Sequence, residues 1–390
     1  MNADERRCAL ALSRMGYHNI TVLRELYNAW GSMADIVKQH AHPEQLAPNM
    51  PERLLAAFAH TDEHLKRADE EMRFAQDNNI SIITLADEAY PQRLKACFDA
   101  PLALFFKGNA NLNAKHCISI VGTRKATPYA ADCIAQLTAR LKQLCPDILI
   151  VSGLAYGVDI MAHRQAIDHA LPTVAVLAHG LDTLYPTRHR KEATLMMQNG
   201  GLLTEYFSQS KIDKRNFLQR NRIVAGMSAA TLLVESAEHG GGLVTCRLAQ
   251  SYQHDVFAFP GSINNPYSVG CNRLIRDNVA GLVTSAEDIL KAMAWEEDMK
   301  KTVATNGASS NAASSMGSSV LGATSASTAK VPNGAQGVLD VLTKENDLHI
   351  DIIATRAGLP VNKVLALLFQ LEMSGMVSSL SGGRYHKVNS

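Results

Sequence analysis

Residues 117–295 alternate short, β-branched apolar runs with stretches of helical periodicity, and this alternation constrains the fold more than any other feature. Each run is bounded by Gly, Pro or polar residues; the runs are CISIVG, ILIVSG, TVAVLA, LLTEY, TLLVE, DVFAFP and GLVTS. Nearly continuous apolar strands separated by helices indicate a parallel sheet that is covered on both faces. We therefore predict an α/β fold with a doubly wound, mostly parallel sheet as the core, over residues 116–295.

The residues before this core predict two smaller regions. In residues 1–75, apolar side chains recur at three-to-four spacing, broken near Gly16 and Gly31, which indicates a small bundle of short helices. Residues 76–115 hold two strand-like runs, ISIITL and ALFFKG, and we expect a turn between them at Tyr90-Pro91. We expect these connecting strands to lead into the core.

The residues after the core predict a linker and a C-terminal domain. The stretch 302–329 contains no charged and no aromatic residue, so we expect a flexible Ser/Ala/Gly linker over residues 296–334. In residues 335–390, two helical segments separated by a turn precede an alternating stretch around Ser381-Gly382-Gly383. A helix-turn-helix followed by a β-hairpin is the pattern of a winged helix.

Composition excludes several classes of protein. Apolar residues make up 46% of the chain and charged residues 19%, so global disorder is excluded. Because Lys+Arg is 38 and Asp+Glu 37, any nucleic-acid surface must come from local clustering of cations. The N-terminus lacks the apolar stretch of a signal peptide, and no uncharged apolar run reaches the length of a membrane span. The seven cysteines are scattered without a CxxC pair, which favours reduced thiols in a cytoplasmic protein over disulfides or a zinc site.

The turn after the first core strand carries features of an anion site. Gly122 allows a sharp turn, and we expect Thr127 to be the N-cap and Pro128 the first residue of a helix. The free N–H groups and the dipole of such a helix favour an anion, and Arg124 and Lys125 place cations beside it. The alternative is an ordinary strand–helix turn with solvated charges.

The turn after the second core strand offers weaker signals. Ser152 does not sit in a GxSxG elbow, because Ile150 and Leu154 occupy the glycine positions, so a hydrolase nucleophile is disfavoured. Asp159 and His163 are four residues apart and share a helix face. Two ligands without a third make a poor metal site, so we favour a structural hydrogen bond for this pair.

The segment 211–222 has the strongest nucleic-acid signature. It holds five cations against one acid, with Phe217 among them. Cations interleaved with aromatic rings suit a single strand, since phosphates pair with Arg or Lys and bases stack on rings. Arg220 and Arg222 flank Asn221 and need not point in the same direction. The alternative for one of them is a buried position against Glu205 or Glu235.

Three glycines at 240–242 precede a helix and suit a phosphate, although a flexible loop is the alternative. The loop is neither a GxGxxG nor a Walker A motif. A further basic patch at 188–191 is, taken alone, a solvated helix start. A parallel sheet gathers the ends of its strands along one edge, and a basic edge longer than one nucleotide suits a polymer better than a single cofactor.

The ordered motifs of the core resemble those of the DNA-processing protein A (DprA/Smf) family. They are GTRKATPYA, SGLAYGVDIMAHRQAI, AVLAHGLDTLYP, GGLLTEY, FLQRNRIVAG, LLVESAEHGGGLVT, FAFPGSI and SVGCNRLIRD. The resemblance is dense over residues 115–290 and extends loosely to the helical N-terminal region, which is similar to a sterile-alpha-motif-like or helix-hairpin-helix domain, and to the winged helix. Three positions depart from the family pattern: Ala130 replaces a Gly, Leu218 a Pro, and Gly241 a Ser.

The resemblance implies a Rossmann-like core that binds single-stranded DNA. It also implies a homodimer formed through that core, and a role in protecting incoming strands and loading the RecA recombinase onto them during natural transformation. By motif, Arg124, Arg220, Arg222 and the 240–242 loop match the DNA-contacting positions of the family. The full set of residues that we expect to contact single-stranded DNA is Gly122, Arg124, Lys125, Ser152, Gly153, Lys191, Lys211, Lys214, Phe217, Arg220, Asn221, Arg222, Gly240, Gly241, Gly242 and Thr245.

Two other functions remain as alternatives. A phosphoribohydrolase with a similar core would need a PGGxGTxxE motif, but Val244 and Leu248 stand where that motif needs Gly and Glu. A regulator that reads duplex DNA would need polar and basic side chains on the recognition helix, but residues 361–373 carry only Lys363 against Glu372. We therefore expect a binding protein rather than an enzyme, with no metal ion, no cofactor and no membrane partner.

Overall fold

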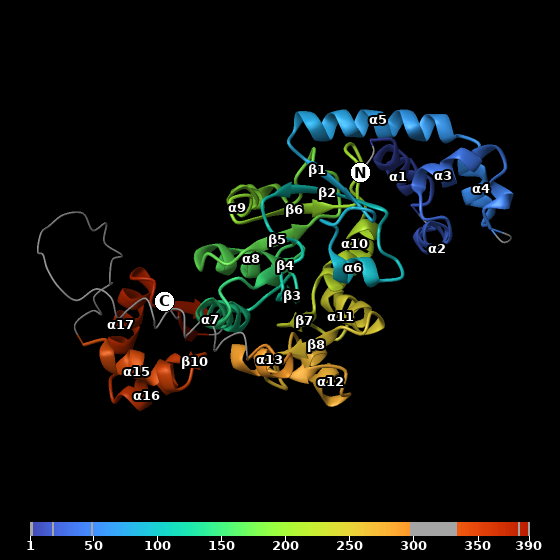
Figure 1. Cartoon of the computed structure of the whole chain (residues 1–390). Helices are drawn as coiled ribbons and strands as arrows, with labels where there is room; N and C mark the ends of the chain where they lie inside the picture. Colours follow the sequence, from blue (N-terminus) through green and yellow to red (C-terminus); the bar gives the residue numbers. More distant parts are fainter. Residues whose placement is uncertain (1–2, 18, 48–49, 297–333, 381–382, 389–390) are drawn as a thin grey trace, which may run out of the picture. The chain divides into compact units, whose positions relative to one another are not determined.

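A computed structural model describes the chain over residues 3–17, 19–47, 50–296, 334–380 and 383–388 (Figure 1). The chain forms two compact units, residues 1–305 and residues 306–390. The finer division of the first unit into a helical domain, connecting strands and a core remains a prediction. The predicted linker over 296–334 lies outside the described residues except at its two end positions.

One nine-stranded sheet forms the centre of the first unit. Its order is β1-β2-β6-β5-β4-β3-β7-β8-β9. The strands are β1 Ser81–Thr84, β2 Ala103–Gly108, β3 Cys117–Val121, β4 Leu149–Ser152, β5 Thr173–Val176, β6 Gly200–Thr204, β7 Ala230–Leu233, β8 Asp255–Ala258 and β9 Gly281–Leu282. Strands β3 to β9 run parallel, whereas β2 pairs antiparallel with β6 and β1 pairs antiparallel with β2. The predicted mostly parallel, doubly wound sheet is confirmed.

Helices cover both faces of this sheet because its central strands are apolar on both sides. The helices that come after β1 in the first unit are α6 Gln92–Ala96, α7 Pro128–Leu144, α8 Val158–Asp168, η3 Thr187–His189, α9 Arg190–Met196, α10 Lys214–Met227, α11 Gly241–Ser251, α12 Val269–Arg276 and α13 Ala286–Ala292. From β3, Ile118 and Ile120 pack with α7, α8 and α13 in one apolar cluster. Cys117 and Val121 belong to the cluster of α10, α11 and α12 on the other face. Helices α7 and α11 therefore lie on opposite faces of the sheet.

The N-terminal residues are helical, as their periodicity indicates. Their helices are α1 Ala3–Met15, α2 Ile20–Trp30, α3 Met33–Lys38, η1 Gln39–Ala41, η2 Pro43–Gln45, α4 Glu52–Phe58 and α5 Thr61–Asp77. Arg7 of α1 donates to both carboxylate oxygens of Asp69 on α5, at 2.6 and 2.8 Å. The buried Glu71 of α5 accepts from the backbone N–H of Ser208 at 2.8 Å and from its hydroxyl at 2.6 Å. Helix α5 is thus bonded directly to the loop that follows β6.

The second unit has the predicted winged-helix architecture. Its elements are α15 Gln336–Lys344, β10 Leu348–His349, α16 Ile350–Ala357, α17 Val361–Met373, β11 Val377–Leu380 and β12 Arg384–Lys387. The strands form a three-stranded antiparallel sheet in the order β10-β12-β11. Buried apolar residues of α15, α16 and α17 make its core. Two residues of the predicted wing turn, 381 and 382, lie outside the described residues.

Within the described ranges, no single helix has the length and apolar composition to cross a membrane. Helices α16 and α17 meet those two criteria only as a pair, and that pair is bent by 106°.

Candidate nucleic-acid interface

The direction of chain progression reverses at β3. After β3 the sheet grows on one side through β4, β5 and β6, and then on the other side through β7, β8 and β9. The loop after β3 leads to α7, and the loop after β7 leads to α11 on the opposite face. Such a reversal opens a crevice at the carboxyl ends of the two strands, where open α/β sheets bind their ligands.

A cavity of about 330 Å³ occupies this crevice. We call it the groove cavity, and its walls are the loops after β3, β4 and β7 together with α10. The predicted residues that the structure brings together here are Gly122, Arg124, Gly153, Phe217, Arg220, Asn221, Gly240, Gly241, Gly242 and Thr245. Residues almost 125 positions apart in the chain therefore line one small space.

Arg124 and Phe217 form the exposed edge of the groove cavity. The guanidinium carbon of Arg124 lies over the Phe217 ring, 5.5 Å from its centroid. Tyr185 contacts the same ring edge to face, at 5.8 Å between centroids. Arg124 is exposed and makes no salt bridge within the described part of the chain. A cation held over an aromatic face, with its charge not neutralised, can bind a phosphate next to a stacked base.

Arg220 forms the back wall of the same cavity but is only 3% exposed. It donates a hydrogen bond to the carbonyl oxygen of Val176, and its guanidinium lies directly on Gly153. A Cβ atom at Gly153 would come within 2.1 Å of Arg220 Nη1, so a side chain there would displace the guanidinium from its position. Burial lowers the pKa of Arg220, and the nearby carboxylate of Asp159 opposes this effect. Arg220 thus gives the cavity a fixed positive charge at its base.

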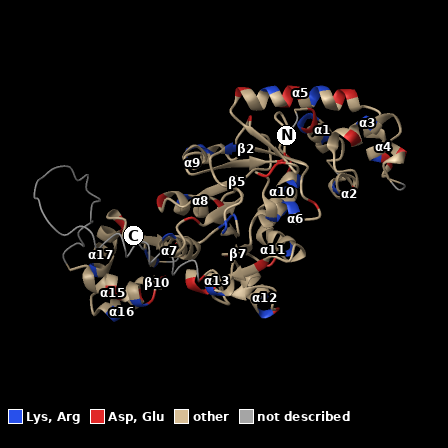
Figure 2. Ribbon diagram, viewed as in Figure 1, with Lys and Arg blue, Asp and Glu red and all other residues tan. Residues whose placement is uncertain are grey.

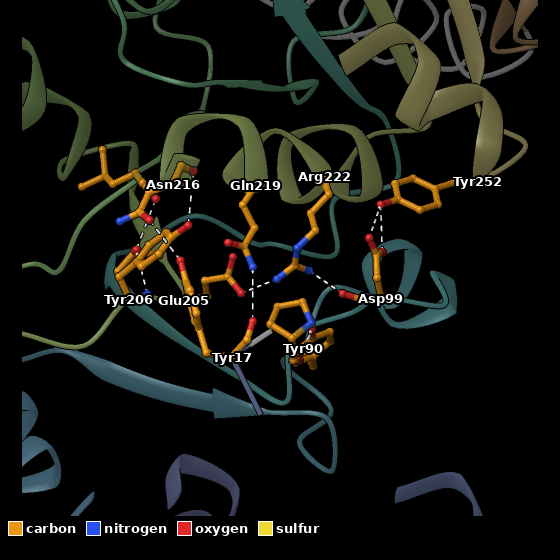
Figure 3. Close-up of polar contacts among 12 residues, drawn as sticks. Tyr17, Tyr90, Asp99, Glu205, Tyr206, Asn216, Gln219, Arg222 and Tyr252 are labelled. Atoms are coloured by element: carbon orange, nitrogen blue, oxygen red, sulfur yellow. Dashed lines mark hydrogen bonds and ion pairs between the residues drawn. The ribbon is translucent and has the colours of Figure 1, made fainter. Parts of the chain in front are cut away.

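Arg222 does not belong to the cavity, which corrects the prediction for this residue. Its guanidinium is bound by the Glu205 carboxylate and by the carbonyl oxygen of Asp99, as Figure 3 shows. Both side chains of the Arg222–Glu205 pair are 6% exposed. Burial lowers the pKa of Arg222, but Glu205 and Asp99 outweigh it, so the pKa is raised and the arginine stays charged. The alternative of a buried arginine paired with Glu205 is the correct one here.

The helix end after β3 is not free for a phosphate. Helix α7 begins at Pro128 with Thr127 as N-cap, as predicted. However, the buried carboxylate of Glu235 accepts from the Thr127 N–H at 2.9 Å and from its hydroxyl at 2.7 Å. This carboxylate places a negative charge at the amino end of α7, where anions are stabilised, and would repel a phosphate. Of the anion site predicted for this turn, only the cations are therefore available, Arg124 and the exposed Lys125.

The glycine loop opens the second helix end at the cavity. Helix α11 begins at Gly241, with Gly240 as its N-cap and no side-chain capping bond. At Gly242 a Cβ atom would lie 2.7 Å from Leu233 and 3.2 Å from the Cα of Gly122, so the loops after β3 and β7 touch at their glycines. At Gly241 there is nothing within 4 Å of such an atom. The start of α11 thus has open space beside Gly241 and no side-chain cap, and the amino end of a helix favours anions.

The remaining predicted residues lie outside the groove cavity. Ser152 is fully buried and donates to the carbonyl oxygen of Ile120 at 2.6 Å, so its role is structural, a correction to the prediction. Lys125, Lys191, Lys211 and Lys214 are exposed cations. Figure 2 shows basic and acidic positions alternating along the ribbon of α5.

Sequence reasoning missed three polar residues that line the cavity, Thr123, Asp159 and His239. Burial raises the pKa of Asp159, and Arg220 opposes the increase. The proposed pairing of Asp159 with His163 is not what the structure shows, because His163 Nδ1 lies 2.8 Å from the hydroxyl of Thr173. Among the described residues, no three His, Cys, Asp or Glu side chains are grouped for a metal ion.

Two family models match the chain. One, described as DNA recombination-mediator protein A, matches residues 81–294, which is more than half of the sequence. The chain belongs to this family. A second, described as the DprA winged helix domain, matches residues 322–383. The predicted membership of the DprA/Smf family is confirmed, and the family is one of DNA-processing recombination mediators.

Individual relatives agree with this assignment. The chain is 36% identical over 207 residues to DNA processing protein DprA of Streptococcus pneumoniae, covering 53% of this chain and 72% of the relative. It is 32% identical over 323 residues to protein Smf of Escherichia coli, covering 82% and 80%.

Two solved structures resemble the fold. The Streptococcus pneumoniae DprA structure superposes with a TM-score of 0.61 at 29% identity, covering 72% of this chain and 95% of that one. A structure of DNA processing protein A from Helicobacter pylori, which concerns the single-stranded DNA binding mode of that protein, superposes with a TM-score of 0.50 at 29% identity. It covers 56% of this chain and 96% of its own.

Proposed function

We propose that this protein binds single-stranded DNA at the carboxyl edge of its sheet, with the groove cavity as the primary contact. The observation that carries the proposal is the Arg124–Phe217 pair, an exposed cation at 5.5 Å from an aromatic centroid at the mouth of the cavity. The first N–H groups of α11 and the buried charge of Arg220 add positive potential around the same space. The single-stranded DNA binding of the Helicobacter pylori relative supports the same class of ligand.

The size and shape of the site favour a single strand over a duplex. A cavity of about 330 Å³ can receive one unpaired base but not a paired one, whose edges are occupied by its partner strand. Stacking on Phe217 needs no particular base, so we expect weak sequence preference and strong salt dependence.

Fluorescence anisotropy of a labelled oligo-dT and a matched duplex, across a salt series, tests this function. We expect the protein to prefer the single strand, with log affinity falling by about 0.7 per neutralised phosphate for each tenfold rise in salt. Phe217→Ala should weaken single-strand binding by about 1–3 kcal/mol, because it removes a stacking platform. Preference for the duplex, or no binding to either, would refute the proposal.

We further propose that the protein acts as a recombination mediator in the cytoplasm, protecting single strands and loading RecA onto them during natural transformation. The core would act as a homodimer, so that two groove cavities engage one strand. Membership of the recombination-mediator family supports this role. RecA filament nucleation on coated single strands should rise with the wild-type protein and not with Arg124→Ala. Light scattering of the purified protein tests the dimer.

A further inference from the structure

A second, larger cavity of about 470 Å³ lies where the helical N-terminal residues meet the core. It belongs entirely to the first compact unit. The turn after α1, the loop after β6 and the first turn of α10 line it, so we call it the seam cavity. The side chains that matter for its chemistry are Arg14, Tyr17, Arg67, Glu205, Lys211 and Asn216. Its volume is in the range of about 300–1,000 Å³ that is typical of ligand sites.

Two of the charges at the seam cavity are neutralised and two are not. Arg67 pairs with Glu71 at 2.8 Å, and Glu205 pairs with Arg222. In the described part of the chain, Arg14 and Lys211 lie within salt-bridge distance of no carboxylate. The excess charge of the cavity is therefore positive.

The contact that Arg14 does make leaves its charge in place. Arg14 Nη1 lies 2.8 Å from Nδ1 of His64. Burial and the Arg14 cation lower the pKa of His64 to about 4, so the imidazole is neutral at pH 7. A neutral ring accepts a hydrogen bond but does not compensate the cation, which remains able to pair with an anion.

An ordered aromatic wall stands beside these cations. The Tyr17 hydroxyl donates to the side-chain oxygen of Asn216 at 3.0 Å, and the Tyr206 hydroxyl donates to the Asn216 carbonyl at 3.2 Å. The two rings meet edge to face, with centroids 6.0 Å apart. Figure 3 shows Tyr17, Tyr206 and Asn216 converging at the start of α10. Hydrogen bonds thus hold the half-buried Tyr17 ring in a fixed position, as a stacking surface requires.

The two cavities flank the same turn of α10. Asn216 lines the seam cavity and Phe217, the next residue, lines the groove cavity. The exposed Lys214 lies in this turn and Lys211 just before it. The amino end of α10 itself is capped by Asp213, whose carboxylate accepts from the Arg215 N–H at 2.8 Å. An anion that crosses this turn would therefore meet lysine side chains rather than the helix end.

We propose that the seam cavity binds a further nucleotide of the DNA strand that occupies the groove cavity. Arg14 and Lys211 contact its phosphates, and its base lies against Tyr17. This subsite rests on the proposed single-stranded DNA binding. It assigns a role to the predicted Lys211 and Lys214, which lie outside the groove cavity but on the path between the two sites.

The test is the length dependence of an Arg14→Ala/Lys211→Ala double variant, measured by anisotropy on two oligo-dT probes. A short probe of about 4 nucleotides fills one site, whereas one of about 25 nucleotides spans both. We expect the long probe to bind roughly two- to thirtyfold more weakly, the equivalent of two lost exposed ion pairs. Its salt slope should fall by about 1.4, for two phosphates released. Short-probe affinity should not change.

Matched controls separate a local effect from a general one. Lys291→Ala removes one exposed cation from α13, which lines neither cavity, and should leave both probes unaffected. Tyr17→Ala should weaken long-probe binding with an unchanged salt slope, because it removes a ring and no charge. Tyr17→Phe, which keeps the ring, should retain most of the affinity. Thermal unfolding of each variant checks that the seam remains folded.

Three outcomes would overturn the subsite. An unchanged long-probe affinity shows that the strand does not reach it. An equal loss on both probes shows a general electrostatic effect. Saturable binding of dTMP that depends on Arg14 and Lys211, without any effect on the long probe, assigns the cavity to free nucleotides. In all three, the wild-type protein still binds single strands and Arg124→Ala still weakens that binding. If the wild-type protein binds no strand, the proposed function fails and this subsite fails with it.

Discussion

Helices α10 and α17 distribute charge and apolar surface in opposite ways. Helix α10 is rich in cations, yet its two central arginines, Arg220 and Arg222, are 3% and 5% exposed. Helix α17 is largely apolar, yet Leu365, Phe369 and Met373 are 50%, 63% and 75% exposed. The polarity of a residue type therefore does not show which side chains of a helix meet solvent. The packing of the neighbouring elements decides this.

The difference follows from what surrounds each helix. The side of α10 that holds Arg220 and Arg222 is buried, so each of these two arginines needs an acceptor within the protein. Glu205 and the Asp99 carbonyl satisfy Arg222, and the Val176 carbonyl satisfies Arg220. Helix α17 packs one face on the small core of the second unit and leaves the residues at four-residue spacing on its other side exposed. A duplex-reading helix would present polar and basic side chains there.

Arg222→Ala should have the largest effect on stability. It leaves Glu205 buried and without its cation, which costs about 3–5 kcal/mol. Urea unfolding measures the loss, and the protein that remains folded should keep its single-strand affinity. A double variant, Arg222→Met with Glu205→Leu, should recover much of the stability because no buried charge remains. A loss of DNA affinity without destabilisation would instead show that Arg222 contacts the DNA.

Arg124→Ala should have the next largest effect, on binding alone. We expect about 1.5–3 kcal/mol weaker single-strand binding, from the loss of a charge-assisted hydrogen bond. The salt slope should decrease by about 0.7. Because Arg124 is exposed, the free energy of unfolding should change by less than about 0.5 kcal/mol. Arg124→Lys serves as the control that keeps the charge; a strongly shifted unfolding curve for Arg124→Ala would show that this arginine is structural.

The buried Arg220 cation should also affect how the free energy of unfolding depends on pH, because it acts on His163. Burial, together with the Arg220 cation, lowers the pKa of His163 to about 3 from an ordinary value of 6.5. Below pH 6.5 the unfolded chain therefore binds a proton that the native protein does not. The free energy of unfolding should fall as pH drops from 6.5 towards 3, by up to about 1.4 kcal/mol per pH unit. His163→Gln should flatten this part of the profile; an unaltered profile would place the dependence elsewhere.

The smallest effect is expected on α17. Phe369→Ser replaces a side chain that is 63% exposed and should change the free energy of unfolding by less than about 0.5 kcal/mol. It should leave single-strand affinity unchanged, because the groove cavity belongs to the other compact unit. Reduced single-strand affinity in this variant would show that α17 takes part in DNA binding, as α10 is proposed to do.

The sheet could be predicted from the sequence because its strands are buried on both faces. Runs such as CISIVG and TVAVLA are almost continuously apolar, so each is recognisable as a buried strand. All of these runs lie on strands of one sheet. The edge at which the binding loops meet also followed from the sequence, since parallel strands place their carboxyl ends together. The antiparallel pairing of β2 with β6 could not be predicted, because such pairing depends on long-range contacts that local patterns do not encode.

The details of the site could be predicted only in part. Arg220 and Arg222 are two residues apart, so they must lie on different faces of a helix, about 200° apart. Periodicity therefore separates them but does not say which one faces the cavity; Glu205, seventeen residues away, decides that. Likewise, nothing local to Thr127 indicates that the Glu235 carboxylate, 108 residues further on, fills the amino end of α7.

The contact between Gly242 and Gly122 has a consequence for how this protein can vary. At position 242 a Cβ atom would press on the Leu233 side chain at 2.7 Å and on the Gly122 backbone at 3.2 Å, so functional sequences should strongly favour glycine. At position 241, one residue away, the space is open, and a serine or another small polar residue would fit. A saturation library selected for DNA binding should therefore retain mainly glycine at position 242 but several small residues at position 241. The close approach of the two loop backbones at Gly242 is the reason for this difference.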